Sequence, residues 1–241
     1  MKFSLAHTAL ALAATLTLAS CGGGGKATYP INVNVKGLAY DGLILSTNGM
    51  DVPVTPPATA GADVNFTFPN GVEYGQVYNV VPKNGDLSKV PYVLGVQAKH
   101  QTCLPNGVYP DNLPHTATAG QFATIQINYV CTLNAYPLTG IVKGLTGSGL
   151  VLANGSSAST AVTASTDSAT IASGVGFSLG SVYFGQTYGV TILAQPAGQI
   201  CTVTAGGDNG KGGGTMKDNN GTDSYTSPGV TDIVVTCGAA S

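Results

Sequence analysis

The chain has 241 residues, of which 43% are hydrophobic and only 8% are charged, and its formal net charge is −2 at neutral pH. An average soluble domain has about 25% charged residues, and the exposed faces of its helices depend on Glu, Lys, Arg and Gln. This composition argues against a helical protein. The slightly acidic balance argues against a nucleic-acid partner, which would require a basic patch.

Residues 1–20 have the pattern of a cleaved secretory signal peptide. Lys2 gives a basic start, an apolar stretch follows from Leu5 to Leu18, and two small residues end the segment. A transmembrane helix is the weaker interpretation, because a span needs about 20 mostly apolar residues. Four glycines, Gly22 to Gly25, would also end such a helix at once.

The tetrapeptide Leu18-Ala19-Ser20-Cys21 resembles the lipobox of bacterial lipoproteins. The resemblance implies that Cys21 receives diacylglycerol, that cleavage follows before it, and that its new amino group is acylated, for example with palmitate. Two or more acyl chains hold a protein stably on a membrane. By resemblance to enteric lipoproteins, Gly22 favours the outer membrane. We therefore expect a lipid-anchored envelope protein, periplasmic or surface-exposed, with residues 21–28 as the anchor and a flexible tether.

The rest of the chain contains two copies of one sequence. Tyr29–Leu38 matches Tyr136–Leu145 at an offset of 107, with six identities in ten positions. Four further matches follow in the same order: Gly42–Leu45 with Gly149–Leu152, Val72–Tyr78 with Val182–Tyr188, Gln101–Cys103 with Gln199–Cys201, and Tyr129–Cys131 with Val235–Cys237. We expect one domain at 29–131, a linker at 132–135, a second domain at 136–237 and a tail at 238–241. Each copy is long enough to bury its own core.

Alternating apolar and polar residues predict short strands in both copies. The apolar members are Ile31, Val33 and Val35, then Val64, Phe66 and Phe68, then Ile125, Ile127 and Tyr129, and in the second copy Val175, Phe177 and Leu179, then Tyr188, Val190 and Ile192, then Ile233 and Val235. Turn signals such as Asn48-Gly49 and Asn154-Gly155 separate the runs. The fold class expected is all-β: two tandem immunoglobulin-like antiparallel β-sandwich domains after the signal peptide.

The five cysteines fit an exported chain. Lipid takes Cys21, which leaves four cysteines for two disulfides in an oxidising compartment. Four cysteines allow three pairings. Only Cys103–Cys131 with Cys201–Cys237 repeats within each copy, and we predict that pairing.

The repeated motifs resemble β-sandwich repeats of proteobacterial surface lipoproteins. These motifs are V-x-G-L near the start, a G-L-x-L strand, a Gln-Pro-x-x-Gln-x-Cys segment, here Gln195–Cys201, and a closing hydrophobic-x-Cys strand. The first copy departs from the third motif, because Gln97–Cys103 reads QAKHQTC. The resemblance implies a sandwich fold and a role as an extracytoplasmic spacer or interaction module.

No group of residues predicts catalysis. His100 and His115 are candidates for a metal-binding pair or for a general base. The better interpretation is that both are histidines of loops without a catalytic or metal-binding role. The acid pairs Glu73 with Asp86 and Asp51 with Asp63 have no spacing that selects them for glycoside hydrolysis. We expect a protein that is not an enzyme and has no cofactor.

Two segments are candidates for ligand binding. The glycine-rich loop 206–223 carries Asp208, Asp218 and Asp223, whose oxygens suit Ca²⁺, but it lacks the glycine and glutamate of an EF-hand. We therefore expect a flexible hairpin loop without a metal. Tyr92 and Tyr109 lie in segments that the second copy lacks, and aromatic side chains there suit a sugar or a protein. The repeated tyrosines Tyr78 and Tyr188 are expected to cap the sandwich rims.

The sequence as a whole predicts a membrane-anchored envelope lipoprotein that acts as a surface spacer, adhesion or protein-interaction module. The alternative is a carbohydrate- or calcium-binding module of a larger envelope assembly. Its partners would be the membrane, through the lipid on Cys21, and an unidentified envelope protein or glycan.

Overall fold

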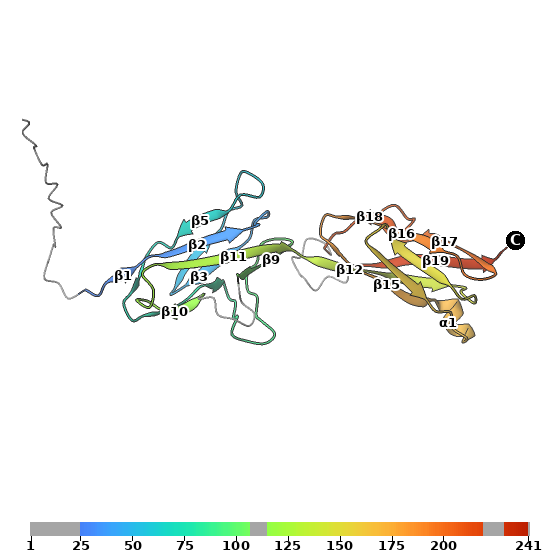
Figure 1. The fold of residues 1–241 in the computed structure, drawn as a ribbon, viewed down its shortest axis with the longest axis horizontal. Coiled ribbons are helices and arrows are strands. Elements are labelled where there is room, and N and C mark those ends of the chain that lie inside the picture. The colour runs from blue at the N-terminus through green and yellow to red at the C-terminus, as the bar shows by residue number, and fades with distance from the viewer. Residues whose placement is uncertain (1–24, 107–114, 219–228, 241) are drawn as a thin grey trace, which may run out of the picture.

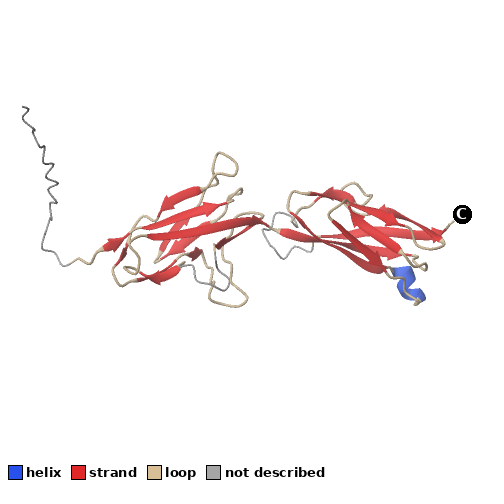
Figure 2. Ribbon diagram, viewed as in Figure 1, coloured by secondary structure: helices blue, strands red, loops and turns tan. Residues whose placement is uncertain are grey.

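A computed structural model describes residues 25–106, 115–218 and 229–240. This part of the chain is built almost entirely of β-strands, arranged as two sandwiches end to end (Figures 1 and 2). Within the described residues, no helix is both long and apolar enough to cross a membrane. The predicted signal peptide and Cys21 lie outside the described residues.

The first repeat has two main sheets. One has the order β5-β2-β11-β9 and the other β4-β3-β8, and two short pairs, β1-β6 and β7-β10, complete the repeat. The strands are β1 (Thr28–Tyr29), β2 (Ile31–Lys36), β3 (Ile44–Thr47), β4 (Met50–Pro53), β5 (Val64–Thr67), β6 (Val72–Glu73), β7 (Val77–Asn79), β8 (Val81–Pro82), β9 (Gln101–Pro105), β10 (Thr116–Thr118) and β11 (Ile125–Leu133).

The second repeat has the same plan, with sheets ordered β15-β12-β19-β17 and β14-β13-β16-β18. Its elements are β12 (Ala135–Lys143), β13 (Leu150–Asn154), β14 (Ala158–Val162), α1 (Ser168–Ser173), β15 (Val175–Tyr183), β16 (Thr187–Ala194), β17 (Gln199–Ala205), β18 (Gly213–Thr215) and β19 (Val230–Ala239). The two hydrophobic cores share no residue, so each repeat buries its own apolar side chains. The all-β sandwich class predicted from the sequence is confirmed.

Alternation along the strands explains how each sandwich forms. In β2 the side chains of Ile31, Val33 and Val35 are buried, and the residues between them are more exposed. Because side chains of a strand point alternately to opposite faces, one face of β2 enters the core and the other faces solvent. Tyr78 and Tyr188, expected at the rims, lie instead within the two cores, where Tyr78 is only 1% exposed.

The first long strand and the last strand of each repeat pair in parallel, a feature that the sequence did not predict. β2 pairs with β11, and β12 pairs with β19, both in parallel register. Since the entering and leaving strands run in the same direction, the chain enters each sandwich at one end and leaves at the other. The two repeats can therefore follow each other in a line (Figure 1).

The predicted disulfide pairing is confirmed. Cys103 bonds to Cys131, and Cys201 bonds to Cys237. In each repeat the two cysteines lie directly opposite each other on neighbouring antiparallel strands, β9 with β11 and β17 with β19. Each disulfide therefore joins two strands of one sheet, with its sulfurs on the core side.

The sequence did not predict the short helix α1. Its six residues are too few to show a helical period, and none of them is buried. The carboxylate of Asp167 accepts hydrogen bonds from the side chain and the backbone N–H of Thr170, which lower the pKa of Asp167 and cap the helix.

Candidate functional site

A single residue joins the two sandwiches. β11 ends at Leu133 and β12 begins at Ala135, which leaves Asn134 between them, only 7% exposed. The backbone N–H of Asn134 donates to the carbonyl of His100 at 2.9 Å, and its carbonyl accepts from the backbone N–H of Phe184 at 2.8 Å. The side chain of Asn134 also accepts from the hydroxyl of Thr102 at 2.7 Å. Asn134 is therefore hydrogen-bonded to both repeats at once.

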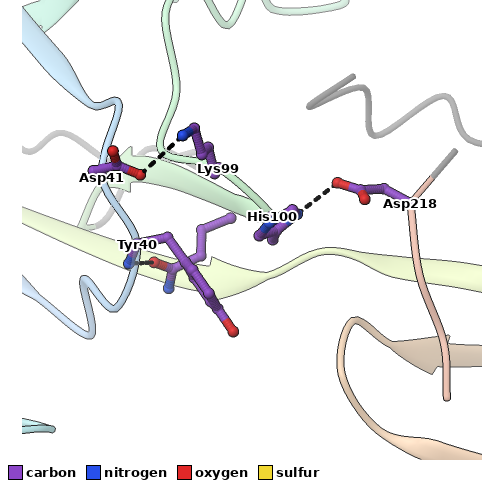
Figure 3. A network of polar contacts seen from close by, with 6 residues as sticks. Tyr40, Asp41, Lys99, His100 and Asp218 are labelled. Carbon is purple, nitrogen blue, oxygen red and sulfur yellow. Dashed lines mark hydrogen bonds and ion pairs between the residues drawn. The ribbon is translucent and has the colours of Figure 1, made fainter. Parts of the chain in front are cut away.

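His100 is the centre of the contact between the repeats. Its ring stacks on the ring of Phe184 with centroids 3.7 Å apart, and it meets the edge of Tyr40 at 5.0 Å. Its Nδ1 lies 2.5 Å from a carboxylate oxygen of Asp218, which belongs to the second repeat (Figure 3). We call His100, Tyr40, Asn134, Phe184 and Asp218 the junction cluster. His100 was expected to be a simple loop histidine, and it does lie in the turn before β9, but it contacts the second repeat.

A buried glutamine holds the turn that carries Tyr40. The carbonyl oxygen of the Gln101 side chain accepts from the backbone N–H groups of Ala39 and Tyr40, and its amide nitrogen donates to the carbonyl of Gly37. Gln101 is 2% exposed, so these bonds satisfy the polar atoms of a side chain that has almost no access to water. An ion pair between Lys99 and Asp41, 3.4 Å apart, lies beside this turn (Figure 3).

The second repeat has the same glutamine but a different surface. Gln199 accepts from Thr146 and Gly147 and donates to the carbonyl of Gly144, which is the arrangement of Gln101. At the positions of Tyr40 and His100, however, the second repeat has Gly147 and Gly198. His100 and Gly198 share the left-handed backbone, with φ of 58° and 70°. Aligning the repeats residue by residue would have drawn attention to Tyr40 and His100, because each is an aromatic side chain where the second repeat has glycine.

The first glutamine of the Cys motif also has the same role in both repeats. The side chain of Gln97 accepts from the backbone N–H of Cys103, and that of Gln195 accepts from Cys201. The first copy therefore keeps this contact although its sequence departs from the motif, but the side-chain amide of Gln97 donates to the carbonyl of Leu94, whereas that of Gln195 donates to the carbonyl of Cys201.

The loop candidates are only partly brought together. Asp208 pairs with Lys217 at 2.9 Å and accepts from the backbone of Thr215, and these hydrogen bonds lower its pKa. Asp208 and Asp218 line an open hollow of about 340 Å³ together with Asp232, but Asp218 is also bound to His100. Asp223 lies outside the described residues. Over residues 25–106, 115–218 and 229–240, no group of three His, Cys, Asp or Glu side chains is placed to hold a metal ion.

The two tyrosines proposed for ligand binding do not form a described site. Tyr92 is half-buried, next to the bridge between Asp86 and Val93. Tyr109 lies outside the described residues.

Two of the candidate acids are held as anions. A hydrogen bond from Lys83 lowers the pKa of Asp51, and hydrogen bonds from Ser88 and Lys89 lower that of Asp86. The general acid of a glycosidase needs the opposite shift, a raised pKa. Neither carboxyl group has the environment of such an acid.

Comparisons with known proteins add little to this geometry. No protein-family model and no curated protein matches the sequence. Among solved structures, the chain is similar to the major pilin protein (T-13) from Streptococcus pyogenes serotype GAS131465, with 11% identity and a TM-score of 0.27. The similarity covers 90% of this chain and 99% of the pilin.

Proposed function

We propose that this chain is a non-enzymatic, lipid-anchored envelope protein whose two sandwiches act as a stiff spacer or interaction module. The junction cluster is the observation that supports this function. Domains joined by a flexible linker move relative to each other by default. Here the single linker residue is hydrogen-bonded on both sides, and an aromatic stack with a histidine–carboxylate contact braces it.

The anchor places the protein on a membrane. The lipobox at Cys21 and the glycine tether support it, and the odd cysteine left by the two disulfides agrees with it. Palmitate labelling of cells that express the full chain, or its Cys21→Ala variant, tests the anchor. We expect label and membrane association only with Cys21; a Cys21→Ala chain that still partitions with the membrane would contradict it. Proteolysis of intact cells then reports whether the domains face outward.

A second candidate is a carbohydrate- or calcium-binding module, for which the open hollow lined by Asp208, Asp218 and Asp232 is the place where a ligand would bind. A calcium titration and a glycan array on residues 26–241 test it. A rise in melting temperature with calcium, or selective glycan binding, would favour this candidate over the spacer. A crosslinking pull-down with the same fragment searches for a protein partner.

A further inference from the structure

Three exposed apolar side chains belong to two neighbouring segments of the first repeat. Tyr74 is 58% exposed and Phe122 is 51% exposed, and Val77 is similarly open. Their segments are joined by hydrogen bonds, from Gly75 to the carbonyl of Ala119 and from Ala119 to the carbonyl of Gln76. We call Tyr74, Val77 and Phe122 the N-terminal patch.

The ring of Tyr74 packs against two neighbouring residues. The ring of Tyr74 lies over Gly120, where an added Cβ would come 2.5 Å from two ring carbons, and its centroid is 6.5 Å from that of Tyr29. A side chain at position 120 would thus displace Tyr74. Phe122 follows two residues later, shortly before β11 begins.

The repeat relationship shows which way this patch faces. Tyr74 corresponds to Phe184. Each donates its backbone N–H to the carbonyl of the residue just before the first strand of its repeat, Tyr74 to Ala27 before β1 and Phe184 to Asn134 before β12. Phe184 uses this position to stack on the module before it. By this correspondence, Tyr74 faces the segment that precedes the first sandwich. That segment leads into β1, at the end of the sandwich away from the second repeat (Figure 1).

What precedes the first sandwich is the tether. Ala27 is six residues after Cys21, and six residues span at most about 20 Å. Resting on the proposed anchor at Cys21, we propose that the N-terminal patch docks on the bilayer surface, so that the first sandwich stands on the membrane. Tyrosine and phenylalanine suit this place, since aromatic rings favour the membrane interface.

The charges near the patch indicate the kind of lipid surface. Lys26 lies in the tether and Glu73 directly precedes Tyr74, so one positive and one negative charge flank the patch. Apolar and aromatic contact, and not attraction to anionic lipid, must therefore provide the binding. Zwitterionic phosphatidylcholine should serve as well as anionic lipid.

The absence of tryptophan from the chain gives a clean probe. Phe122→Trp places a single fluorophore in the patch, and Leu193→Trp places one at a similarly exposed position of the second repeat. The processed, lipidated full chain is reconstituted in vesicles of brominated phosphatidylcholine, whose bromines quench tryptophan on contact. We expect blue-shifted, quenched emission from Phe122→Trp only. Tyr74→Ala in the same background should weaken docking about tenfold.

Each outcome decides the proposal. Equal quenching at both positions, or quenching at neither, overturns docking. If the emission is blue-shifted but not quenched, and the shift depends on protein density on the vesicle, the patch binds a second copy of the chain. That outcome also overturns docking on the bilayer. If mass spectrometry finds no acyl chains on Cys21, the proposed anchor fails by itself. The mature chain coupled through Cys21 to a maleimide lipid then tests the patch separately.

Discussion

The ring of His100 lies flat on the ring of Phe184, with centroids 3.7 Å apart and planes 3° from parallel, although the two residues belong to different sandwiches. The ring of Phe184 also packs against the ring of Tyr40 in an edge-to-face arrangement, with centroids 5.9 Å apart. The stack sits beside Asn134, the one residue between the repeats. Contacts at a short linker restrict both bending and rotation, so we expect this cluster to limit the motion of one sandwich relative to the other.

Phe184→Ala should loosen the junction without unfolding either sandwich. The lost stack is worth about 0.5–1.5 kcal/mol, and the backbone hydrogen bond to Asn134 remains. Small-angle X-ray scattering of residues 26–241 should show a broader distribution of interdomain distances. The neighbouring exposed residue gives the control, Tyr183→Ala, which should leave the scattering unchanged. Identical profiles for wild type and Phe184→Ala would contradict the role of the stack.

His100 and Asp218 should be energetically coupled. Their contact is mostly shielded from water, with side chains 17% and 5% exposed, and it joins the two repeats. In a double-mutant cycle of His100→Ala and Asp218→Ala, we expect a coupling free energy of about 1 kcal/mol in urea unfolding. The exposed pair Lys89 and Asp86, within the first repeat, should show less. Additive effects of the two junction variants would show that the contact stabilises nothing.

Removing Gln101 should destabilise the first repeat. Gln101→Ala removes the acceptor of the backbone N–H groups of Ala39 and Tyr40, and each lost hydrogen bond costs about 0.5–1.5 kcal/mol. Gln199→Ala should have the same effect on the second repeat. The exposed Gln126, on β11, supplies the control Gln126→Ala, which should leave the melting temperature almost unchanged. A Gln101→Ala protein as stable as the control would refute this account.

Alternation along the strands, the duplication and the cysteine pairing were readable from the sequence, because each is a local pattern or a comparison of the two copies. Ile31, Val33 and Val35 show this most clearly. The contact of His100 with Asp218 was not readable, because it joins residues 118 positions apart through the relative placement of two domains. The parallel pairing of β2 with β11 was also missed, since alternation gives the face of a strand but not its neighbour. The repeated glutamines were noticed as a motif, but their role depends on which backbone groups the folded turn brings to them.

Each disulfide should stabilise its own repeat. The loops that they close span 28 and 36 residues, and chain-entropy arithmetic gives about 3.5–4 kcal/mol for each. Replacing Cys201 and Cys237 with Ala should lower the calorimetric transition of the second repeat and leave that of the first largely in place. Cys21→Ala, which removes a cysteine outside both disulfides, is the control. A uniform loss in both transitions would mean that the repeats unfold as one unit.

Alkaline pH should destabilise the protein through Tyr129. Burial raises the pKa of this tyrosine well above its usual value, and its hydroxyl donates to the carbonyl of Val80 at 2.9 Å. Below about pH 10 the hydroxyl is protonated in both states, so its contribution to stability is constant. Above that pH the unfolded chain loses the proton while the folded chain keeps it. The free energy of unfolding then falls by about 1.4 kcal/mol per pH unit for this group.

Tyr129→Phe separates this effect from general alkaline damage. It should cost about 1 kcal/mol at neutral pH, because the carbonyl of Val80 loses its donor. The variant should also reduce the slope of unfolding free energy against pH by the contribution of one proton. The slope is measured by urea titrations between about pH 9.5 and 11, because the tyrosine pKa in the unfolded chain is about 10. Tyr183→Phe, at an exposed tyrosine, should keep the wild-type slope. Burial also raises the pKa of Tyr188. The Tyr129→Phe protein should therefore still lose stability at alkaline pH, but with a smaller slope. An unchanged slope in Tyr129→Phe would show that the folded protein releases this proton as readily as the unfolded chain.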